Sequence, residues 1–324
     1  MKKIDLVTGF LGSGKTTFIK EYADYLVRCG EKVAIIVNDY GAINVDRLLL
    51  GSSLGDKCHL EMVIGGDKDC TRRRLKTKLI SMAMQDYTHV ILEPSGIFDV
   101  DDFLDMLYEE PLDRWYEMGS IISIVEADID KSMSDAARYI MISELSKAGI
   151  IILSKIEETY DQLDESKKSE MESIIKKECL DFINEGLEDF KCSRRFDNLY
   201  IWNEGSITDE DFQKISRSGY TSTDMINLHS VEDSFDSAFF FHVETDLESL
   251  EETLKGIFND KEAGSIVRIK GFIRSNDAWL QVNATRHGVR INPSPEGQEL
   301  FIVIGENLDK EIIGKHWKSY RNGL

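Results

Sequence analysis

The first 205 residues alternate short apolar runs with longer amphipathic stretches, and this pattern predicts both elements and fold. Strands are expected at 4–8, 33–38, 89–93, 121–126, 150–154 and 199–202, and helices at 16–29, 71–84 and 134–147. Continuous Val and Ile runs separated by helices are typical of a parallel sheet buried on both faces. We therefore expect a doubly wound, mostly parallel α/β domain over residues 1–205.

The rest of the chain predicts a second, smaller domain. Residues 157–195 carry many charges around a modest apolar period, which favours one or two surface helices on the first domain. Residues 206–236 are rich in Ser, Thr and Asp, so we expect a linker there. Beyond it, a strand, a helix, four consecutive strands and a last helix near 308–320 predict a small α+β domain at 237–324.

Charge and cysteine content narrow the function classes. The 324 residues carry a formal net charge of -20, a balance that repels nucleic acid and anionic membranes, so we expect neither as a partner. No apolar run approaches the roughly 18 residues of a membrane span, and no leader pattern precedes the first strand. The odd count of five scattered cysteines favours reduced thiols and a cytoplasmic location.

A phosphate-binding loop follows the first strand. Residues 9–16 read Gly-Phe-Leu-Gly-Ser-Gly-Lys-Thr, and an amphipathic helix follows, as the phosphate-loop pattern requires. Glycines let backbone N–H groups turn towards phosphates, the lysine supplies a cation, and the threonine hydroxyl can ligate Mg²⁺. The alternative is a glycine turn that binds nothing. We expect nucleotide contacts from Gly9, Gly12, Ser13, Gly14, Lys15, Thr16 and Thr17.

The end of the strand at 89–93 predicts the second half of the site. Residues 93–96 read Glu-Pro-Ser-Gly. An acidic residue that leaves a buried strand beside a phosphate loop can hold the water shell of Mg²⁺ or orient the attacking water, which is the role expected of Glu93. Gly96 would let the backbone approach the γ-phosphate. The alternative is an ordinary turn at the end of a strand.

Taken in order, these motifs resemble the CobW family of metal-related P-loop GTPases, relatives of the urease and hydrogenase maturation GTPases. Residues 9–17 and 93–96 are similar to two of its segments, and residues 38–41, followed by Asp46, resemble its switch segment. The order of residues 271–273, Trp279, Arg286 and 301–305 resembles its C-terminal domain. The resemblance implies GTP hydrolysis with Mg²⁺. Lys15 would stabilise charge, Thr16 would hold the ion, and Asp39, Asp46 and Glu93 would bind the ion or place the water.

The base-recognition segment departs from the family pattern. The family usually has Asn/Thr-Lys-x-Asp, whose carboxylate accepts hydrogen bonds from guanine, whereas residues 154–157 here read Ser-Lys-Ile-Glu. A lysine and a carboxylate remain, so the resemblance implies guanine contacts from Ser154, Lys155 and Glu157. The alternative is a polar loop at the end of a strand that makes no contact with the base.

The metal-binding segment departs further. The family typically has Cys-x-Cys-Cys, and residues 67–70 here read Asp-Lys-Asp-Cys. With Asp67, Asp69 and Cys70 as ligands, the preference would shift from zinc and copper towards Mg²⁺, Mn²⁺ or Fe²⁺. Read alone, the segment is a solvated loop, and Arg72, Arg73 and Arg74 beyond it are the solvated start of a helix or a docking surface for an acidic partner.

Three functions follow as hypotheses. The first is a GTPase switch in metal handling or metalloenzyme maturation, with a client metalloprotein as partner and a second divalent transition metal of unidentified element. The second is a nucleotide-dependent adaptor or activator that carries no cargo metal, which the altered cysteine motif favours. An ATP-using small-molecule kinase is the third, although no lid segment is apparent. The sequence leaves the oligomeric state open.

Overall fold

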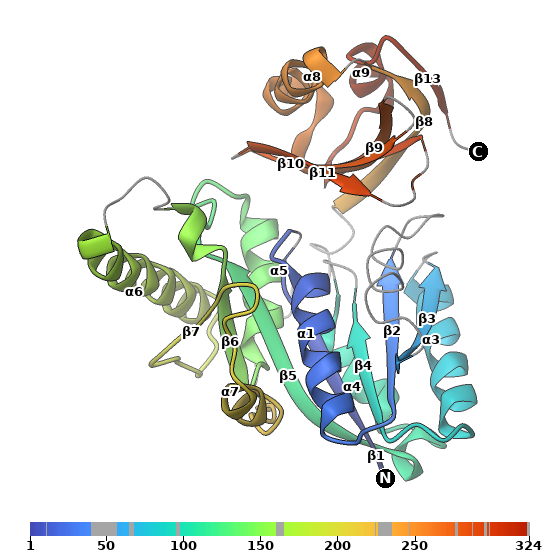
Figure 1. Ribbon diagram of the computed structural model, residues 1–324, viewed down its shortest axis with the longest axis vertical. Coiled ribbons are helices and arrows are strands. Elements are labelled where there is room, and N and C mark those ends of the chain that lie inside the picture. The colour runs from blue at the N-terminus through green and yellow to red at the C-terminus, as the bar shows by residue number, and fades with distance from the viewer. Residues whose placement is uncertain are drawn as a thin grey trace. The chain divides into compact units, whose positions relative to one another are not determined.

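The computed structural model describes the whole chain except residues 11, 40–56, 65–67, 95–97, 160–164, 224, 226–234, 246, 276–277, 287, 295–296, 298 and 323–324. The chain divides into two compact units, Met1–Leu228 and His229–Leu324. Each unit has its own sheet and its own hydrophobic core (Figure 1). Among the described helices, none combines the length and the apolar character that crossing a membrane requires.

The first unit is built on a seven-stranded sheet of order β3-β2-β4-β1-β5-β6-β7. All neighbouring strands in it are parallel. Its strands are β1 (Lys2–Thr8), β2 (Val33–Asp39), β3 (His59–Ile64), β4 (His89–Glu93), β5 (Tyr116–Glu126), β6 (Ile150–Ser154) and β7 (Tyr200–Trp202). Because parallel strands end at one edge, the last residues of β1, β2, β4 and β6 lie at the same edge of the sheet. The phosphate loop and the segments that begin at Glu93 and Ser154 start there.

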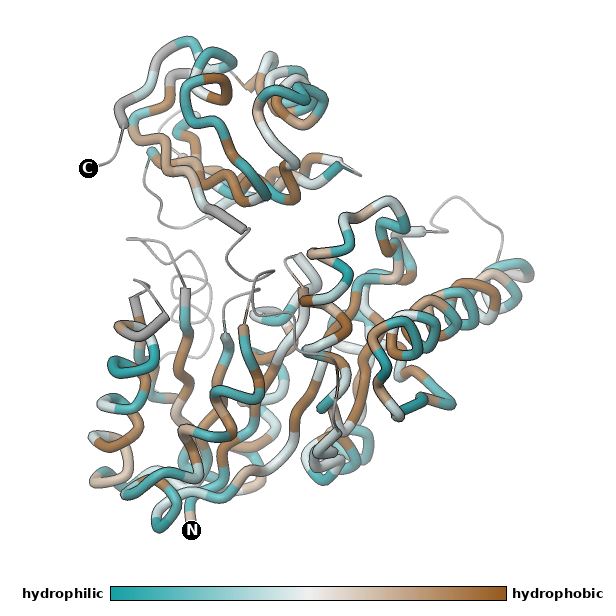
Figure 2. The backbone as a smooth tube through the Cα atoms, turned by 180° about the vertical axis from the view of Figure 1, so that it is seen from behind, coloured by the Kyte–Doolittle hydropathy of each residue, from teal (hydrophilic) through white to brown (hydrophobic). Residues whose placement is uncertain are grey.

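Helices cover both faces of this sheet, as the continuous apolar strands predict. One face packs against α1 (Lys15–Arg28) and α7 (Asp209–Ile215). The other face packs against α3 (Lys68–Ala83), α4 (Val100–Leu107), α5 (Asp135–Ser146) and α6 (Glu165–Asp189). Figure 2 shows hydrophobic residues along the strands, whereas the helices alternate in hydropathy. The doubly wound prediction is confirmed.

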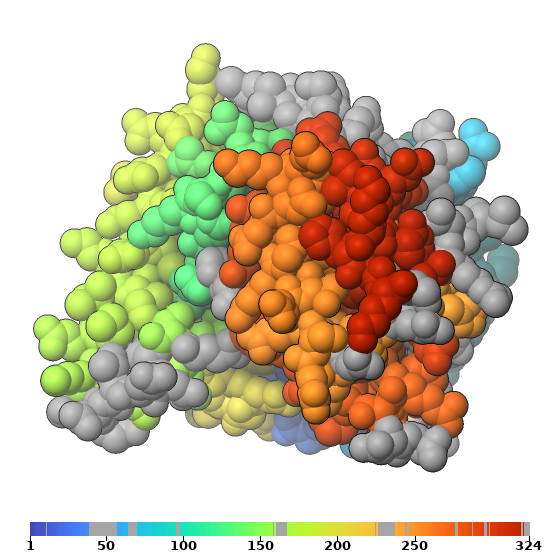
Figure 3. Space-filling model, turned by 90° about the horizontal axis from the view of Figure 1, so that it is seen from above, coloured from blue at the N-terminus to red at the C-terminus, as the bar shows by residue number. Residues whose placement is uncertain are grey.

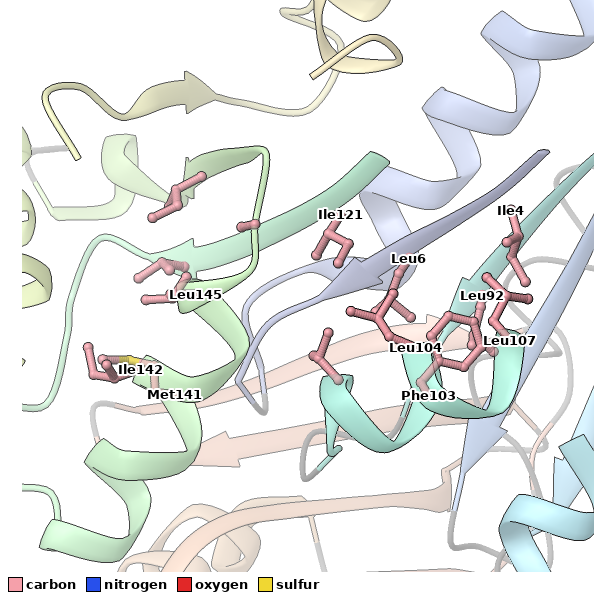
Figure 4. Close-up of a cluster of buried hydrophobic side chains, with 14 of the residues drawn as sticks. Ile4, Leu6, Leu92, Phe103, Leu104, Leu107, Ile121, Met141, Ile142 and Leu145 are labelled. Atoms are coloured by element: carbon pink, nitrogen blue, oxygen red, sulfur yellow. The ribbon is translucent and has the colours of Figure 1, made fainter. Parts of the chain in front are cut away.

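The core between the sheet and α4 illustrates how the pattern buries its residues. Ile4, Leu6 and Leu92 project from β1 and β4 onto Phe103 and Leu107 of α4 (Figure 4). Strand β4 is buried along its whole length. Burial of each such aliphatic side chain contributes about 1.5–3 kcal/mol, which is why these strands occupy the centre of the sheet.

The sequence pattern missed the edge strand β3 and the helix α4. Strand β3 has a mixed composition because, among the described strands, it pairs with β2 alone at the edge of the sheet. Its His59 Nε2 lies 3.0 Å from Glu61 Oε1, and Glu61 also pairs with Lys78 of α3. A strand with one free edge does not need the continuous apolar run that identifies a central strand.

The predicted linker also differs from the structure. Within residues 206–236, Thr208 caps α7 with a complete capping box. Phe212 of this helix is 3% exposed, and its ring lies 6.0 Å from that of Tyr22 and 5.2 Å from that of Tyr25 on α1. Part of the polar segment therefore belongs to the first unit, because two apolar residues in α7, Phe212 and Ile215, suffice to anchor it.

The second unit is an antiparallel sheet of order β11-β10-β9-β12-β8-β13. Its strands are β8 (Phe235–Glu244), β9 (Ser265–Ser275), β10 (Ala278–Thr285), β11 (Gly288–Ser294), β12 (Leu300–Glu306) and β13 (Ser319–Asn322). The helices α8 (Leu247–Asn259) and α9 (Lys310–Lys315) pack on one face and are visible in orange and dark red in Figure 3.

The last predicted helix, 308–320, is shorter in the structure. Helix α9 ends at Lys315, and β13 then pairs with β8. Trp317 and Tyr320 lie against the ring of Phe240, with centroid distances of 6.2 and 5.2 Å. The apolar residues that suggested a continuing helix pack instead from a turn and an edge strand.

Candidate nucleotide-binding site

The phosphate loop joins β1 to α1 and needs its glycines for backbone geometry. Gly9, Gly12 and Gly14 have φ values of +145°, +97° and +93°, which side chains strongly disfavour. A Cβ on Gly9 would collide with the carbonyl oxygen of Ile124 and lie 2.7 Å from Ser13 Oγ. The loop is therefore pressed against β5, and Leu11 is its one residue outside the described part.

The amino end of α1 can accept an anion. Gly14 caps the helix without a side-chain hydrogen bond, and the first turn contains no acidic residue. Ser13 is 2% exposed, and its hydroxyl has no hydrogen-bond partner among the described residues. Unsatisfied N–H groups at a helix amino end, beside an orphaned buried hydroxyl, suit a phosphate.

Lys15 lies folded over the loop. It is buried, and its Nζ donates hydrogen bonds to the carbonyl oxygens of Gly9 at 2.6 Å and Phe10 at 3.4 Å. The ammonium group is therefore held next to the N–H groups that would surround a phosphate. It is positioned to exchange a carbonyl partner for a phosphate oxygen.

Thr16 and Glu93 meet where β1 and β4 end side by side. Thr16 Oγ1 donates a 2.8 Å hydrogen bond to Glu93 Oε1, and Glu93 is 3% exposed. A hydroxyl next to a carboxylate matches the oxygen ligands and water shell that Mg²⁺ prefers. Thr17 is half-buried in the first turn of α1.

Three other predicted site residues are described only in part or not at all. Asp46 and Gly96 are outside the described residues. Asp39 ends β2, where its backbone pairs with Ile64, but its side chain is not described.

The three residues predicted to contact guanine lie at the same edge of the sheet, but their side chains have different partners. Ser154 is fully buried, and its hydroxyl donates to the carbonyl oxygen of Ser13 at 2.7 Å, so it supports the phosphate loop. Lys155 has a left-handed backbone (φ 58°), and its Nζ lies 3.0 Å from Glu126 Oε1. Glu157 is exposed and accepts a 2.8 Å hydrogen bond from Asn203 Nδ2.

Sequence reasoning missed several residues of this edge. Trp202 ends β7 and Asn203 follows it, and the Trp202 ring lies 3.3 Å from where a Cβ on Gly14 would be. Glu126, at the end of β5, is the partner of Lys155. The signal for both was available, because polar residues at the ends of predicted parallel strands gather at one edge.

Glu144 is the largest omission. This residue of α5 is 1% exposed, and its Oε2 accepts a 3.0 Å hydrogen bond from the backbone N–H of Gly9. Burial raises the pKa of Glu144 to about 8, against the smaller lowering effects of Lys15 and of the backbone N–H groups of Gly9 and Phe98. A glutamate among buried positions of a helix was the available signal.

The altered cysteine segment is only partly described. Asp67 lies outside the described residues, and Asp69 lies in α3 with its side chain undescribed. Cys70 is half-buried. Within the described ranges, no three His, Cys, Asp or Glu side chains are grouped to hold a metal ion. The segment's metal ligands therefore stay a prediction.

Arg72, just after this segment, is not the solvated residue expected. It lies 2.9 Å from Asp102 and 2.7 Å from Glu109, on α4 and beyond its end. Lys76, one turn further along α3, also binds Glu109. These pairs tie the helix after the cysteine segment to the helix after Glu93, whereas Arg73 and Arg74 are exposed.

Comparison with known proteins agrees with this arrangement of motifs. Residues 3–180 match the model of the CobW/HypB/UreG nucleotide-binding domain, and residues 237–321 match that of the cobalamin synthesis protein CobW C-terminal domain. The zinc chaperone YeiR of Escherichia coli is 26% identical over 168 residues, or 51% of this chain and 50% of YeiR. The zinc chaperone YjiA of the same organism is 26% identical over 47% of this chain and 48% of YjiA.

One relative aligns over most of its length. The zinc-regulated GTPase metalloprotein activator 1 of Schizosaccharomyces pombe is 23% identical over 95% of this chain and 83% of the relative. The match spans about half the length of the two Escherichia coli relatives. Among solved structures, Zn(II)-bound YjiA GTPase aligns over 97% of both chains at 15% identity, with a TM-score of 0.37.

Proposed function

Because the chain belongs to the CobW/HypB/UreG family of nucleotide-binding proteins, we propose that it binds GTP with Mg²⁺ and hydrolyses it. The hydrogen bond between Thr16 and Glu93 carries this proposal. It joins the end of the phosphate loop to the end of β4, so that a Mg²⁺ ligand and an acid lie at the same place. A glycine turn that binds nothing would not need this pair.

In this proposal, the chain's own residues divide the work. Lys15 leaves the carbonyl oxygens of Gly9 and Phe10 for the β- and γ-phosphates, where its charge stabilises the transition state. Thr16 and Glu93 would hold the ion and its water shell, and bound Mg²⁺ would neutralise charge on the phosphates. Asp39 and Asp46 remain candidates for the ion or for the attacking water.

Guanine selectivity would come from the edge formed by β6 and β7. Glu157 carries the carboxylate for the guanine N–H groups, and Asn203 holds that carboxylate at 2.8 Å. The stem of Lys155 would pack on the base while Glu126 holds its ammonium group. Ser154 acts through the loop, since its hydroxyl binds Ser13.

We further propose that the GTP cycle is a switch in metal handling or metalloenzyme maturation, with a client metalloprotein as partner. The relatives' names, zinc chaperone and zinc-regulated GTPase metalloprotein activator, support this role. The candidate cargo ligands are Asp67, Asp69 and Cys70. Since two of the three are carboxylates, we expect a harder divalent ion than zinc.

A second candidate is an adaptor that binds GTP but no cargo metal. The observation that favours it is the replacement of two cysteines by aspartates around Lys68, whose charge repels a cation. In both readings the nucleotide site is the same, so they differ only in metal binding.

Nucleotide binding and hydrolysis are tested first, by isothermal titration and by phosphate release. Wild type should bind GTP more tightly than ATP, and Lys15→Ala should lose hydrolysis while Lys20→Ala, an exposed lysine on the same helix, should keep it. An inactive wild type, or a Lys15→Ala variant as active as wild type, would refute the GTPase proposal.

The cargo is tested by titrating Zn²⁺, Ni²⁺, Co²⁺, Fe²⁺ and Mn²⁺ with and without Mg²⁺ and a non-hydrolysable GTP analogue. If the nucleotide controls a cargo metal, the affinity for that metal should depend on the nucleotide, because coupling between two sites is reciprocal. Binding should be lost in an Asp67→Ala, Asp69→Ala, Cys70→Ala variant and kept in Cys29→Ala, which removes an exposed thiol elsewhere. If the protein binds GTP but no metal ion other than Mg²⁺, the adaptor hypothesis replaces the hypothesis of a cargo metal.

A further inference from the structure

Glu144 is a buried acid for which the proposed hydrolysis assigns no role. It lies on α5 and is 1% exposed. Burying a carboxyl group is unfavourable unless it gains partners, so its contacts indicate what it does. Those contacts lead to the phosphate loop.

The first contact is with the backbone of Gly9. Glu144 Oε2 accepts the N–H of Gly9 at 3.0 Å. Gly9 is also so close to Ile124 of β5 and to Ser13 that no Cβ would fit. The first residue of the loop therefore contacts both the carboxyl group of α5 and a strand of the sheet.

Lys15 binds the same glycine, but through the backbone carbonyl group of Gly9 rather than its N–H group. Its Nζ donates to the carbonyl oxygen of Gly9 at 2.6 Å. A bound triphosphate would compete for that ammonium group, whereas the Gly9 N–H contact with Glu144 does not depend on it. The carboxyl group therefore keeps the start of the loop in place while the lysine changes partner.

The backbone of Glu144 is itself held by residues of the two strands beside the loop. Ser123 Oγ lies 3.3 Å from the carbonyl oxygen of Glu144, to which it donates, and 2.6 Å from Thr8 Oγ1. Thr8 and Ser123 lie near the ends of β1 and β5. The helix that carries Glu144 is thus tied to the strands that carry the loop.

Charge also links Glu144 to the nucleotide site. In the part of the chain that the structure describes, Lys15 is the charged side chain that acts on this carboxyl group; burial raises the pKa of Glu144 to about 8 even though Lys15 lowers it. Phosphates that neutralise Lys15 remove this effect and add negative charge nearby. Both changes favour the protonated carboxyl group.

We propose that Glu144 is a positioning residue of the nucleotide site, which holds the backbone of Gly9 and takes up a proton from solvent when a triphosphate binds beside Lys15. The inference rests on the proposed binding of GTP. It requires a carboxyl or amide oxygen at this place for binding, and a titratable group for the proton.

Four variants separate these requirements. Glu144→Gln keeps the oxygen and removes the titration, Glu144→Leu removes both, and Glu144→Asp keeps the charge on a chain too short to reach Gly9. Glu178→Gln, an exposed acid on α6, is the matched control. Affinity for Mg-GTP is measured by titration calorimetry at pH 8 in buffers of different ionisation enthalpy, which gives the protons taken up, and circular dichroism checks folding.

We expect Glu144→Gln and Glu178→Gln to bind GTP within about twofold of wild type, and Glu144→Leu and Glu144→Asp about tenfold more weakly, as for one lost hydrogen bond. Proton uptake should disappear in Glu144→Gln and persist in Glu178→Gln. Full affinity in folded Glu144→Asp, or unchanged proton uptake in Glu144→Gln, would overturn the inference. A wild type that binds no nucleotide would overturn the proposed function as well. If wild type binds GTP and the Glu144 variants show the same affinity and proton uptake as wild type, only the role of Glu144 is overturned.

Discussion

Thr16 donates a 2.8 Å hydrogen bond to Glu93, a residue 77 positions further along the chain. The first belongs to the turn that starts α1, and the second ends the strand next to β1. Neighbouring parallel strands deliver their loops to the same edge, and here that edge places a hydroxyl and a carboxylate within one hydrogen bond. The two halves of the proposed Mg²⁺ site are thus assembled by strand order.

If this pair holds Mg²⁺, removing the hydroxyl should change the dependence on the ion. We expect Thr16→Ala to need at least tenfold more Mg²⁺ for half-maximal GTP hydrolysis, because one oxygen ligand is lost, and Thr16→Ser to behave like wild type. Hydrolysis rates over a Mg²⁺ series give the result. Identical Mg²⁺ curves for Thr16→Ala and wild type would remove Thr16 from the ion site.

The edge formed by β6 and β7 should set the preference between bases. We expect Glu157→Ala to reduce the ratio of GTP to ATP affinity by about tenfold to a hundredfold, since the guanine N–H groups lose their acceptor. Asn203→Ala should give a smaller change of the same sign, because Asn203 only holds the carboxylate. Competition binding with both nucleotides measures the ratio, and Glu204→Ala, an exposed acid in the following turn, serves as control. An unaltered ratio in Glu157→Ala would move base recognition elsewhere.

Helix α7 should be part of the stable first unit. Phe212 is 3% exposed, and its ring stacks near Tyr22 and Tyr25, so Phe212→Ala should cost about 3–5 kcal/mol of unfolding free energy. Met84→Ala, at a site that is 79% exposed, should change it by less than about 0.5 kcal/mol. Urea unfolding followed by circular dichroism tests both. Equal stabilities would mean that residues 206–216 behave as the linker that their composition predicts.

Stability should fall as the pH rises through neutrality. The pKa of Glu144 is raised from 4.5 to about 8, so the folded chain binds this proton more tightly than the unfolded chain. The resulting stabilisation is complete below about pH 4.5 and is lost as the pH rises through 8, at up to about 1.4 kcal/mol per pH unit. Urea unfolding at pH 6, 7 and 8.5 should show that the unfolding free energy of wild type decreases with pH and that this decrease is absent in Glu144→Gln. If the decrease persists in the variant, groups other than Glu144 cause it.

The sequence by itself determined the parallel sheet, the phosphate loop and the order of the motifs. Strands such as β4 and β6 must be buried on both faces, and a continuous apolar run is the only local pattern that satisfies this, so their bounds follow from composition. The loop is equally local, because its three positive φ values require glycine at fixed positions. No knowledge of distant residues is needed for either.

Only the tertiary structure decided which side chains meet. Glu144 reaches Gly9 across 135 positions, and Trp202 lies against Gly14 because β7 takes its place at the edge of the sheet. Likewise α7 joins the first unit because the Phe212 ring packs against aromatic rings of α1 and Ile215 is buried in the same core. Such contacts depend on strand order and helix packing, which bring together residues whose separation along the chain carries no periodic signal.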